Sequence, residues 1–205
     1  MKIKTILILL LAFAAIAVIV YSFQSKPSSE DYGKEIQNER DEKDAFMRSD
    51  KNSPLRGPEG EFKPLRYFPA DLKYQINATL IPIENKKRLS LSTSNGEENE
   101  YREFAFAKFV LDGVENNLLI LEITEPGPYR GTLFLAFADE TSAKETYGAG
   151  RYLDLKKVPG ATSILLDFNK AYNPYCAYSN DYSCPFPPPQ NVMKVAIRAG
   201  EKSYH

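Results

Sequence analysis

From Tyr67 onward, apolar and polar residues alternate with a period of two, and turn signals interrupt this pattern repeatedly. Between Tyr74 and Leu80 every second residue is apolar, which is typical of a half-buried strand. Asn95-Gly96 and Asp112-Gly113 are dipeptides that favour tight hairpin turns. No helical period separates these segments. The pattern therefore predicts a mainly β fold, a single antiparallel β-sandwich or barrel of about eight strands.

The expected strands share short apolar or alternating runs bounded by turn residues, and they cover 74–80, 89–91, 101–111, 118–123, 132–138, 151–155, 163–168 and 192–198. Roughly 140 residues suffice for one hydrophobic core, so we expect residues 63–205 to form a single β domain.

Residues 1–25 are expected to form a signal peptide or an uncleaved membrane anchor. Lys2 and Lys4 precede an apolar run, and residues 6–23 would be roughly 27 Å long as a helix, close to the thickness of a bilayer core. The favoured interpretation is an anchor in which residues 6–23 contact the membrane. The rest of the chain would then be exported across the cytoplasmic membrane, with the C-terminal domain outside.

Residues 26–62 form a polar segment that is expected to hold one charged helix and a linker. Ser28 resembles an N-cap residue at the start of this helix, and Phe46 and Met47 are its expected docking contacts. The helix should end before Pro54, because a residue that precedes proline avoids the α region.

Composition excludes several classes of function. The chain has 26 Lys and Arg against 27 Asp and Glu, so no excess of basic charge indicates nucleic-acid binding. Its single histidine, His205, is the last residue, where a frayed terminus cannot hold an imidazole for a Ser/His/Asp triad or a zinc site. No cofactor is expected, and any catalysis would depend on Asp, Arg, Tyr and Cys.

Two cysteines, Cys176 and Cys184, lie in the part that is expected to be exported. An oxidising compartment favours a structural disulfide between them. A metal site is the first alternative, although two cysteines without a nearby histidine supply too few ligands. A redox pair is the second, although the spacing is not that of a C-x-x-C motif.

The segment 169–191 is too long for a plain hairpin connection, and loops of this length are usually functional or disordered. It contains five prolines and four tyrosines. Proline reduces the entropy lost on ordering, so we expect a rigid, ordered loop.

Several runs carry a resemblance: Lys43-Asp44-Ala45-Phe46, Ser53-Pro54-Leu55, Tyr67-Phe68-Pro69, 146–152, 167–191 and 198–202. Together they resemble a bacterial and archaeal family known as domain of unknown function 1684, over roughly residues 40–203. One departure is Ala143, where the family more typically has glycine, which is expected to alter a turn. The resemblance implies a fold and a set of characteristic residues but no established activity, and it leaves metal or redox use of the cysteines open.

Asp167 and Arg151 are the first candidate site residues. Asp167 ends an apolar strand and is either a general base or ligand-binding group, or a carboxylate that caps its own loop. Arg151 follows a Gly-Ala-Gly turn and is either an anion-binding guanidinium or half of an internal ion pair, for which Asp167 is a candidate partner.

Asn169, Tyr172, Asn173 and Tyr175 are the remaining candidates, either as polar walls of a pocket or as struts that hold the long loop. Glu201 could reach the same candidate site.

Three hypotheses follow. The first is a membrane-tethered β-domain that binds a small ligand or an envelope protein at the Arg151/Asp167/Tyr172 surface. The second is an enzyme with Asp167 as base or nucleophile, Arg151 as anion clamp and Tyr172 or Tyr175 as proton donor. The third is a metal or redox site at Cys176 and Cys184.

Overall fold

The computed structural model describes residues 28–55 and 62–205, together with Phe13. The signal or anchor expected over residues 1–25 and part of the expected linker therefore lie outside the described residues. In the portion that the structure describes, no helix has the length and apolar character needed to cross a bilayer.

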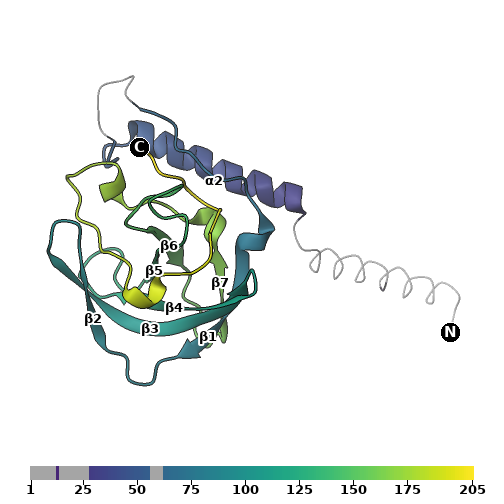
Figure 1. The fold of residues 1–205 in the computed structure, drawn as a ribbon, viewed down its shortest axis with the longest axis vertical. Helices are drawn as coiled ribbons and strands as arrows, with labels where there is room; N and C mark the ends of the chain where they lie inside the picture. The colour runs from purple at the N-terminus through teal and green to yellow at the C-terminus, as the bar shows by residue number, and fades with distance from the viewer. Residues whose placement is uncertain (1–12, 14–27, 56–61) are drawn as a thin grey trace, which may run out of the picture.

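The body of the protein is one antiparallel sheet of seven strands (Figure 1). The strands are β1 (Gln75–Pro82), β2 (Arg88–Ser92), β3 (Glu98–Leu111), β4 (Val114–Ile123), β5 (Leu133–Phe137), β6 (Arg151–Leu155) and β7 (Ser163–Asp167). Their order along the sheet is β6-β5-β4-β3-β1-β7, and β2 pairs separately with β3. The mainly β, antiparallel fold is confirmed, and seven of the eight expected strands are present.

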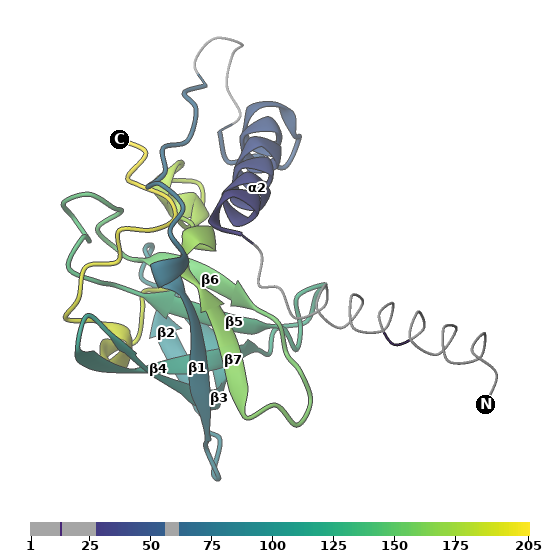
Figure 2. The same ribbon diagram turned by 90° about the vertical axis from the view of Figure 1, so that its right-hand side faces the viewer.

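The sheet curls into a half-barrel instead of forming two packed layers (Figure 2). This curl brings the edge strands β6 and β7 close to each other. The concave side holds the largest hydrophobic cluster, in which the ring of Phe168 packs against Phe109 and Phe137 with centroids 5.9 and 5.2 Å away. A second cluster, which includes Tyr101 and Phe134, covers the opposite face of β4–β6.

Helix α2 (Ser29–Ser49) is the expected charged helix, and it packs across one end of the half-barrel (Figures 1 and 2). The side chain of Ser28 accepts the backbone N–H of Asp31, which confirms the predicted N-cap. Tyr32 and Met47 are buried, so a narrow apolar stripe attaches an otherwise solvated helix to the body. Phe46 packs beside Met47, as expected.

The expected strand over 192–198 is absent from the sheet, and this prediction was wrong. The backbone of this segment forms only an isolated bridge to the residues after β5, through Met193 and Ala138, and its other bonds include several to side chains. The N–H of Ile197 donates to the Asp139 carboxylate at 3.1 Å, and the carbonyls of Ile197 and Ala199 accept from Arg151. The alternation of apolar and polar residues over 192–198 therefore reflects alternate burial of side chains in a segment that is not a strand.

The long loop 169–191 contains or borders three short 3-10 turns, Phe168–Lys170, Tyr175–Ala177 and Pro189–Asn191. Asn191 fixes its far end, because its side-chain amide donates to the carbonyls of Leu119 and Ala136 and accepts the N–H of Leu119 at 2.7 Å. The loop thus folds back over β4–β6 and covers their second cluster.

Candidate functional site

Arg151 lies inside the protein, where only 1% of its surface is exposed. Its guanidinium donates to Asp139 at 2.9 Å and to the carbonyls of Ile197 and Ala199 at 2.8 and 2.5 Å. Burial lowers the pKa of Arg151, and the Asp139 charge opposes that shift. Arg151 is therefore an internal brace whose ion-pair partner is Asp139, and it does not reach a ligand surface.

Asp167 attaches helix α2 to the sheet. Its carboxylate accepts the Tyr32 hydroxyl at 2.8 and 2.9 Å, the Gln75 amide at 3.1 Å and the backbone N–H of Asn169 at 3.1 Å. Burial, together with the Asp167 charge, raises the pKa of Tyr32. Asp167 thus both caps its own loop and fixes the helix.

Asn169 and Asn173 are struts of the long loop. The amide of Asn169 exchanges two 2.9 Å hydrogen bonds with the backbone of Asp71. Asn173 donates to Glu201 at 2.9 Å, and Glu201 is fully buried and also bonded to Tyr178. The amide nitrogens of both residues are engaged in hydrogen bonds, whereas the amide oxygen of Asn173 is buried without a hydrogen-bond partner among the described residues.

Asp167 borders a cavity of about 380 Å³, whereas Tyr172 and Tyr175 together line a separate cavity. This cavity has a volume of about 820 Å³ and lies between helix α2, the second cluster on β4–β6 and the loop 169–191. Its walls include six tyrosines: Tyr101, Tyr129, Tyr152, Tyr172, Tyr175 and Tyr182. We call it the tyrosine cavity.

The walls of the tyrosine cavity are held by ring contacts. Phe134 stacks on Tyr101 with centroids 5.6 Å apart and meets the edge of Tyr152 at 4.7 Å. Tyr152 in turn meets Tyr172 at 6.0 Å, and its hydroxyl donates to the carbonyl of Pro185 at 2.6 Å. These contacts prearrange an aromatic surface.

Asp154 places a carboxylate among the aromatic side chains that line the tyrosine cavity. The side chain lines the tyrosine cavity and accepts the hydroxyl of Tyr172 at 2.9 Å. Asp154 is exposed on the surface, yet partial desolvation raises the pKa of its carboxyl group, and the bond from Tyr172 and the charge of Lys43 oppose that shift. Lys43, the other charged residue of the lining, lies 2.8 Å from Glu201 and 4.8 Å from the ring centroid of Tyr172.

The sequence-based reasoning missed Asp154, although a signal was present. In β6, Arg151, Leu153 and Leu155 share one face of the strand, while Tyr152 and Asp154 share the other. The acidic residue beside a tyrosine on the face opposite the leucines indicated the side of the strand that borders the cavity.

Cys184 also lines the tyrosine cavity, and Cys176 lies half-buried beside it. The backbone N–H of Cys176 lies 3.2 Å from the sulfur of Cys184. Both are free thiols, so the expected disulfide is not formed in this structure. Among the described residues, no three His, Cys, Asp or Glu side chains gather as a metal site requires.

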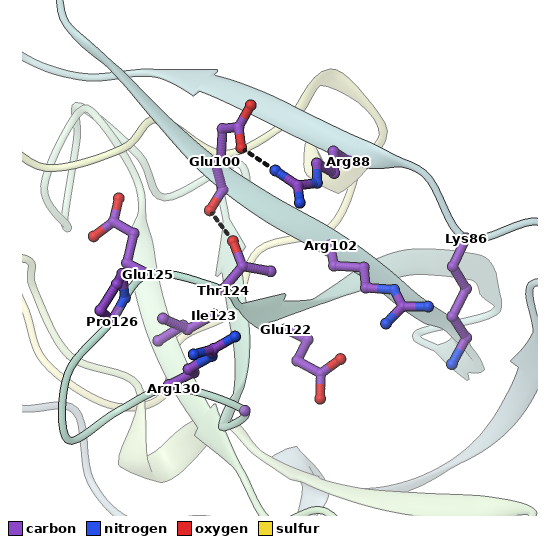
Figure 3. A pocket seen from close by; sticks show the side chains of 11 residues that line it. Lys86, Arg88, Glu100, Arg102, Glu122, Ile123, Thr124, Glu125, Pro126 and Arg130 are labelled. Carbon is purple, nitrogen blue, oxygen red and sulfur yellow. Dashed lines mark hydrogen bonds and ion pairs between the residues drawn. The ribbon is translucent and has the colours of Figure 1, made fainter.

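A second hollow, of about 710 Å³, lies over the β2–β4 edge and is open and highly charged (Figure 3). Its basic side chains alternate with acidic ones, and Arg88 points to Glu100 at 2.9 Å. Glu122, on the same hollow, pairs with Lys157 at 2.5 Å. Arg102, Glu125 and Arg130 also line this hollow and form no ion pair with another described residue.

Arg151, Asp167 and Tyr172 thus belong to three different sets of hydrogen bonds, and the structure does not gather them into the single surface that was expected. Tyr172 and Tyr175 share a cavity with Asp154, whereas Arg151, Asp167, Asn169 and Asn173 hold the frame around it.

Comparison with known proteins agrees with this fold. A solution NMR structure of an uncharacterized protein of Haloarcula marismortui is 36% identical, covers 86% of this chain and 98% of its own, and superposes with a TM-score of 0.64. No curated protein matches the chain. The family model described as "Protein of unknown function (DUF1684)" matches residues 60–202, and the chain belongs to this family.

Proposed function

We propose that this protein is a binding module for a small organic cation, held in the tyrosine cavity with its charged group beside Asp154. The observation that carries the proposal is a carboxylate that opens into an aromatic cavity of about 820 Å³. This volume falls within the usual range for small-molecule sites, roughly 300–1,000 Å³.

The charge of the lining favours a cation over an anion. Lys43 and Asp154 are the charged residues among the lining side chains, and Lys43 already pairs with the buried Glu201. Asp154 has only the neutral hydroxyl of Tyr172 as its hydrogen-bond partner. The charge of Lys43 also acts on Asp154, but among the described residues Asp154 has no ion-pair partner of its own. Tyrosine faces add to this preference, because a cation over an aromatic face gains about 0.5–2 kcal/mol.

The body of the ligand is expected to be apolar. Phe134, Leu133 and Leu155 contribute to the cavity beside the six tyrosines, and burial of apolar surface contributes about 25 cal/mol per Å². Ring contacts such as that between Phe134 and Tyr152 hold the walls in place before binding, which lowers the entropy cost of association.

The proposal also places this module outside the cytoplasmic membrane. Support comes from the apolar run at residues 6–23 behind two lysines, which is typical of an export signal or anchor. A tethered module of this kind would meet its ligand in the envelope.

Calorimetric titration with benzyltrimethylammonium, and with neutral benzyl alcohol as the uncharged probe, tests the function. We expect saturable binding of the cation and weaker binding of the alcohol. Asp154→Asn keeps the side-chain shape and should weaken cation binding roughly tenfold, because a hydrogen bond or ion contact to a charged group contributes about 1.5 kcal/mol.

The matched control is Asp112→Asn, which removes an exposed carboxylate that pairs with Lys73 far from the cavity lining. Its affinity for the cation should equal that of the parent protein. Absence of saturable binding by the parent, or equal affinities for Asp154→Asn and the parent, would refute the proposed function.

A further inference from the structure

Cys176 and Cys184 form a close thiol pair beside the tyrosine cavity, which Cys184 lines. Cys184 is 9% exposed, and its sulfur faces the backbone N–H of Cys176 at 3.2 Å. Cys176 belongs to the 3-10 turn Tyr175–Ala177 and remains half-exposed. One thiol is therefore reachable from outside, and the second lies directly behind it.

The surroundings of Cys176 favour its thiolate. The thiol of Cys184 and the hydroxyl of Tyr147 both donate to its sulfur, the latter at 3.8 Å, and Ser94 also faces it. The bond from Cys184 lowers the pKa of Cys176 to about 6, whereas the same contact raises the pKa of Cys184. The contact thus favours ionisation of the Cys176 thiol over that of Cys184. A thiolate beside a protonated second thiol has the charge distribution of an attacking and a resolving cysteine.

We propose that Cys176 and Cys184 are a reversible dithiol–disulfide couple, in which Cys176 attacks a low-molecular-weight disulfide and Cys184 resolves the product. In the first step the Cys176 thiolate bonds to one sulfur of the small disulfide, whose S–S bond breaks, and one small thiolate leaves with the bonding electrons. In the second step Cys184 loses its proton to that thiolate and attacks the sulfur of Cys176. The second small thiolate leaves and takes a proton from water. Overall the protein loses two electrons, and the small disulfide gains them as two thiols.

Oxidation should act on the cavity through Tyr175. The backbone of Cys184 is fixed to the turn after β2, because its N–H donates to the Ser94 hydroxyl at 3.2 Å and its carbonyl accepts the Ser94 N–H at 3.1 Å. Cys176 must therefore move toward Cys184 when the bond forms. Tyr175 precedes Cys176 in the chain, lines the cavity and packs on Tyr182 with centroids 5.1 Å apart. The disulfide form should displace this wall and weaken binding, a consequence that rests on the proposed function.

To test this, the full chain is incubated in glutathione buffers that range from reducing to oxidising. The reaction is quenched with acid, the free thiols are alkylated, and the products are identified by mass spectrometry. We expect the intramolecular disulfide to form as the buffer becomes oxidising and to disappear in excess reduced glutathione. Cys184→Ser should accumulate a glutathione adduct at Cys176, whereas Cys176→Ser should acquire little adduct at the buried Cys184. A crosslink that resists excess reduced glutathione, or thiols that stay free in oxidised glutathione, would overturn the inference.

The pH dependence of alkylation supplies a second readout. The rate of iodoacetamide reaction at Cys176 should reach half its maximum near pH 6, because its pKa is lowered to about 6, against about 8.5 for an ordinary cysteine. The groups that face Cys176 are Tyr147, Ser94 and Cys184, of which Cys184 has the largest effect. If the alkylation rate of Cys176 reached half its maximum at the pH of an ordinary cysteine, this result would contradict the role of Cys176 as the attacking thiol.

Benzyltrimethylammonium titration of the reduced and oxidised protein separates this inference from the function on which its consequence rests. We expect oxidation to weaken binding by about fivefold or more, the usual lower range of coupling between two sites. If the disulfide forms reversibly and neither state binds the cation, the proposed function fails while the thiol couple stands. Equal affinities in the two states would overturn the link to the cavity.

Discussion

Replacing Arg151 with methionine should destabilise the fold strongly without acting on the tyrosine cavity. The substitution keeps most of the side-chain length and removes the charge that faces Asp139. The side chains of both residues are at most 1% exposed, so Asp139 would be left as a buried, uncompensated carboxylate. The carbonyls of Ile197 and Ala199 would lose their donors as well. Breaking a buried pair on one side costs about 3–5 kcal/mol.

Urea unfolding followed by circular dichroism measures this loss. A slope of about 2 kcal/mol per molar urea converts the loss to a midpoint shift of roughly 2 M. In a heating experiment each kcal/mol corresponds to about 2–4 °C for a chain of this size, so the melting temperature should fall by roughly 6–20 °C.

Arg198→Met is the matched control, because Arg198 pairs with Glu145 at 2.9 Å while its side chain is 59% exposed. An exposed pair contributes about 1 kcal/mol or less, so this variant should unfold close to the parent. Restoring neutrality with Arg151→Met and Asp139→Leu together should recover part of the stability. Our reasoning is refuted if Arg151→Met unfolds like Arg198→Met, or if it stays stable and loses cation binding.

Three further predictions concern the helix, a turn and the cavity. Tyr32→Phe removes the hydroxyl that donates to Asp167 at 2.8 Å, and it should lower the free energy of unfolding by about 1.5–3 kcal/mol, measured by urea unfolding; an unchanged midpoint would contradict the helix-fixing role of Asp167. Ala143 has a φ of 62°, a left-handed conformation that costs an L-residue roughly 1–2 kcal/mol. Ala143→Gly should therefore raise the melting temperature slightly, even after the entropy cost of glycine. A lower melting temperature for Ala143→Gly would refute the strain at this position. Partial desolvation raises the pKa of Asp154, and the carboxyl group is neutral below that pKa. Affinity for benzyltrimethylammonium should therefore decline on acidification from a higher pH than the value of about 3.9 for a free aspartate, whereas Asp154→Asn should bind with no such decline.

The sequence predicted the sheet well because strand periodicity and turn chemistry are local. Asn95-Gly96 and Asp112-Gly113 are followed by β3 and β4, and Gly96 and Gly113 have the positive φ that such turns require. The start of α2 was predicted because the N-cap at Ser28 involves only the next three residues. Local conformation also explains why glycine is more typical of the family at position 143, since Ala143 has a positive φ that favours glycine.

The candidate site was predicted less well because its geometry depends on contacts between distant segments. Arg151 pairs with Asp139 and with the backbone after Ile197, and no local pattern distinguishes this partner from Asp167. The choice between one curled sheet and two layers likewise depends on long-range packing. Strand alternation alone would have placed Arg151 on the core face and Asp154 on the opposite one.

The most direct test of the central claim is an NMR titration of the isotope-labelled protein with benzyltrimethylammonium, in which the shifted resonances locate the ligand. We predict saturable shifts at Asp154, at Tyr172 and Tyr175, and at the neighbouring lining residues of the tyrosine cavity, with loss of these shifts in Asp154→Asn. Shifts confined to the charged hollow around Arg88 and Glu100, or no saturable shifts at all, would contradict the claim that the tyrosine cavity binds organic cations.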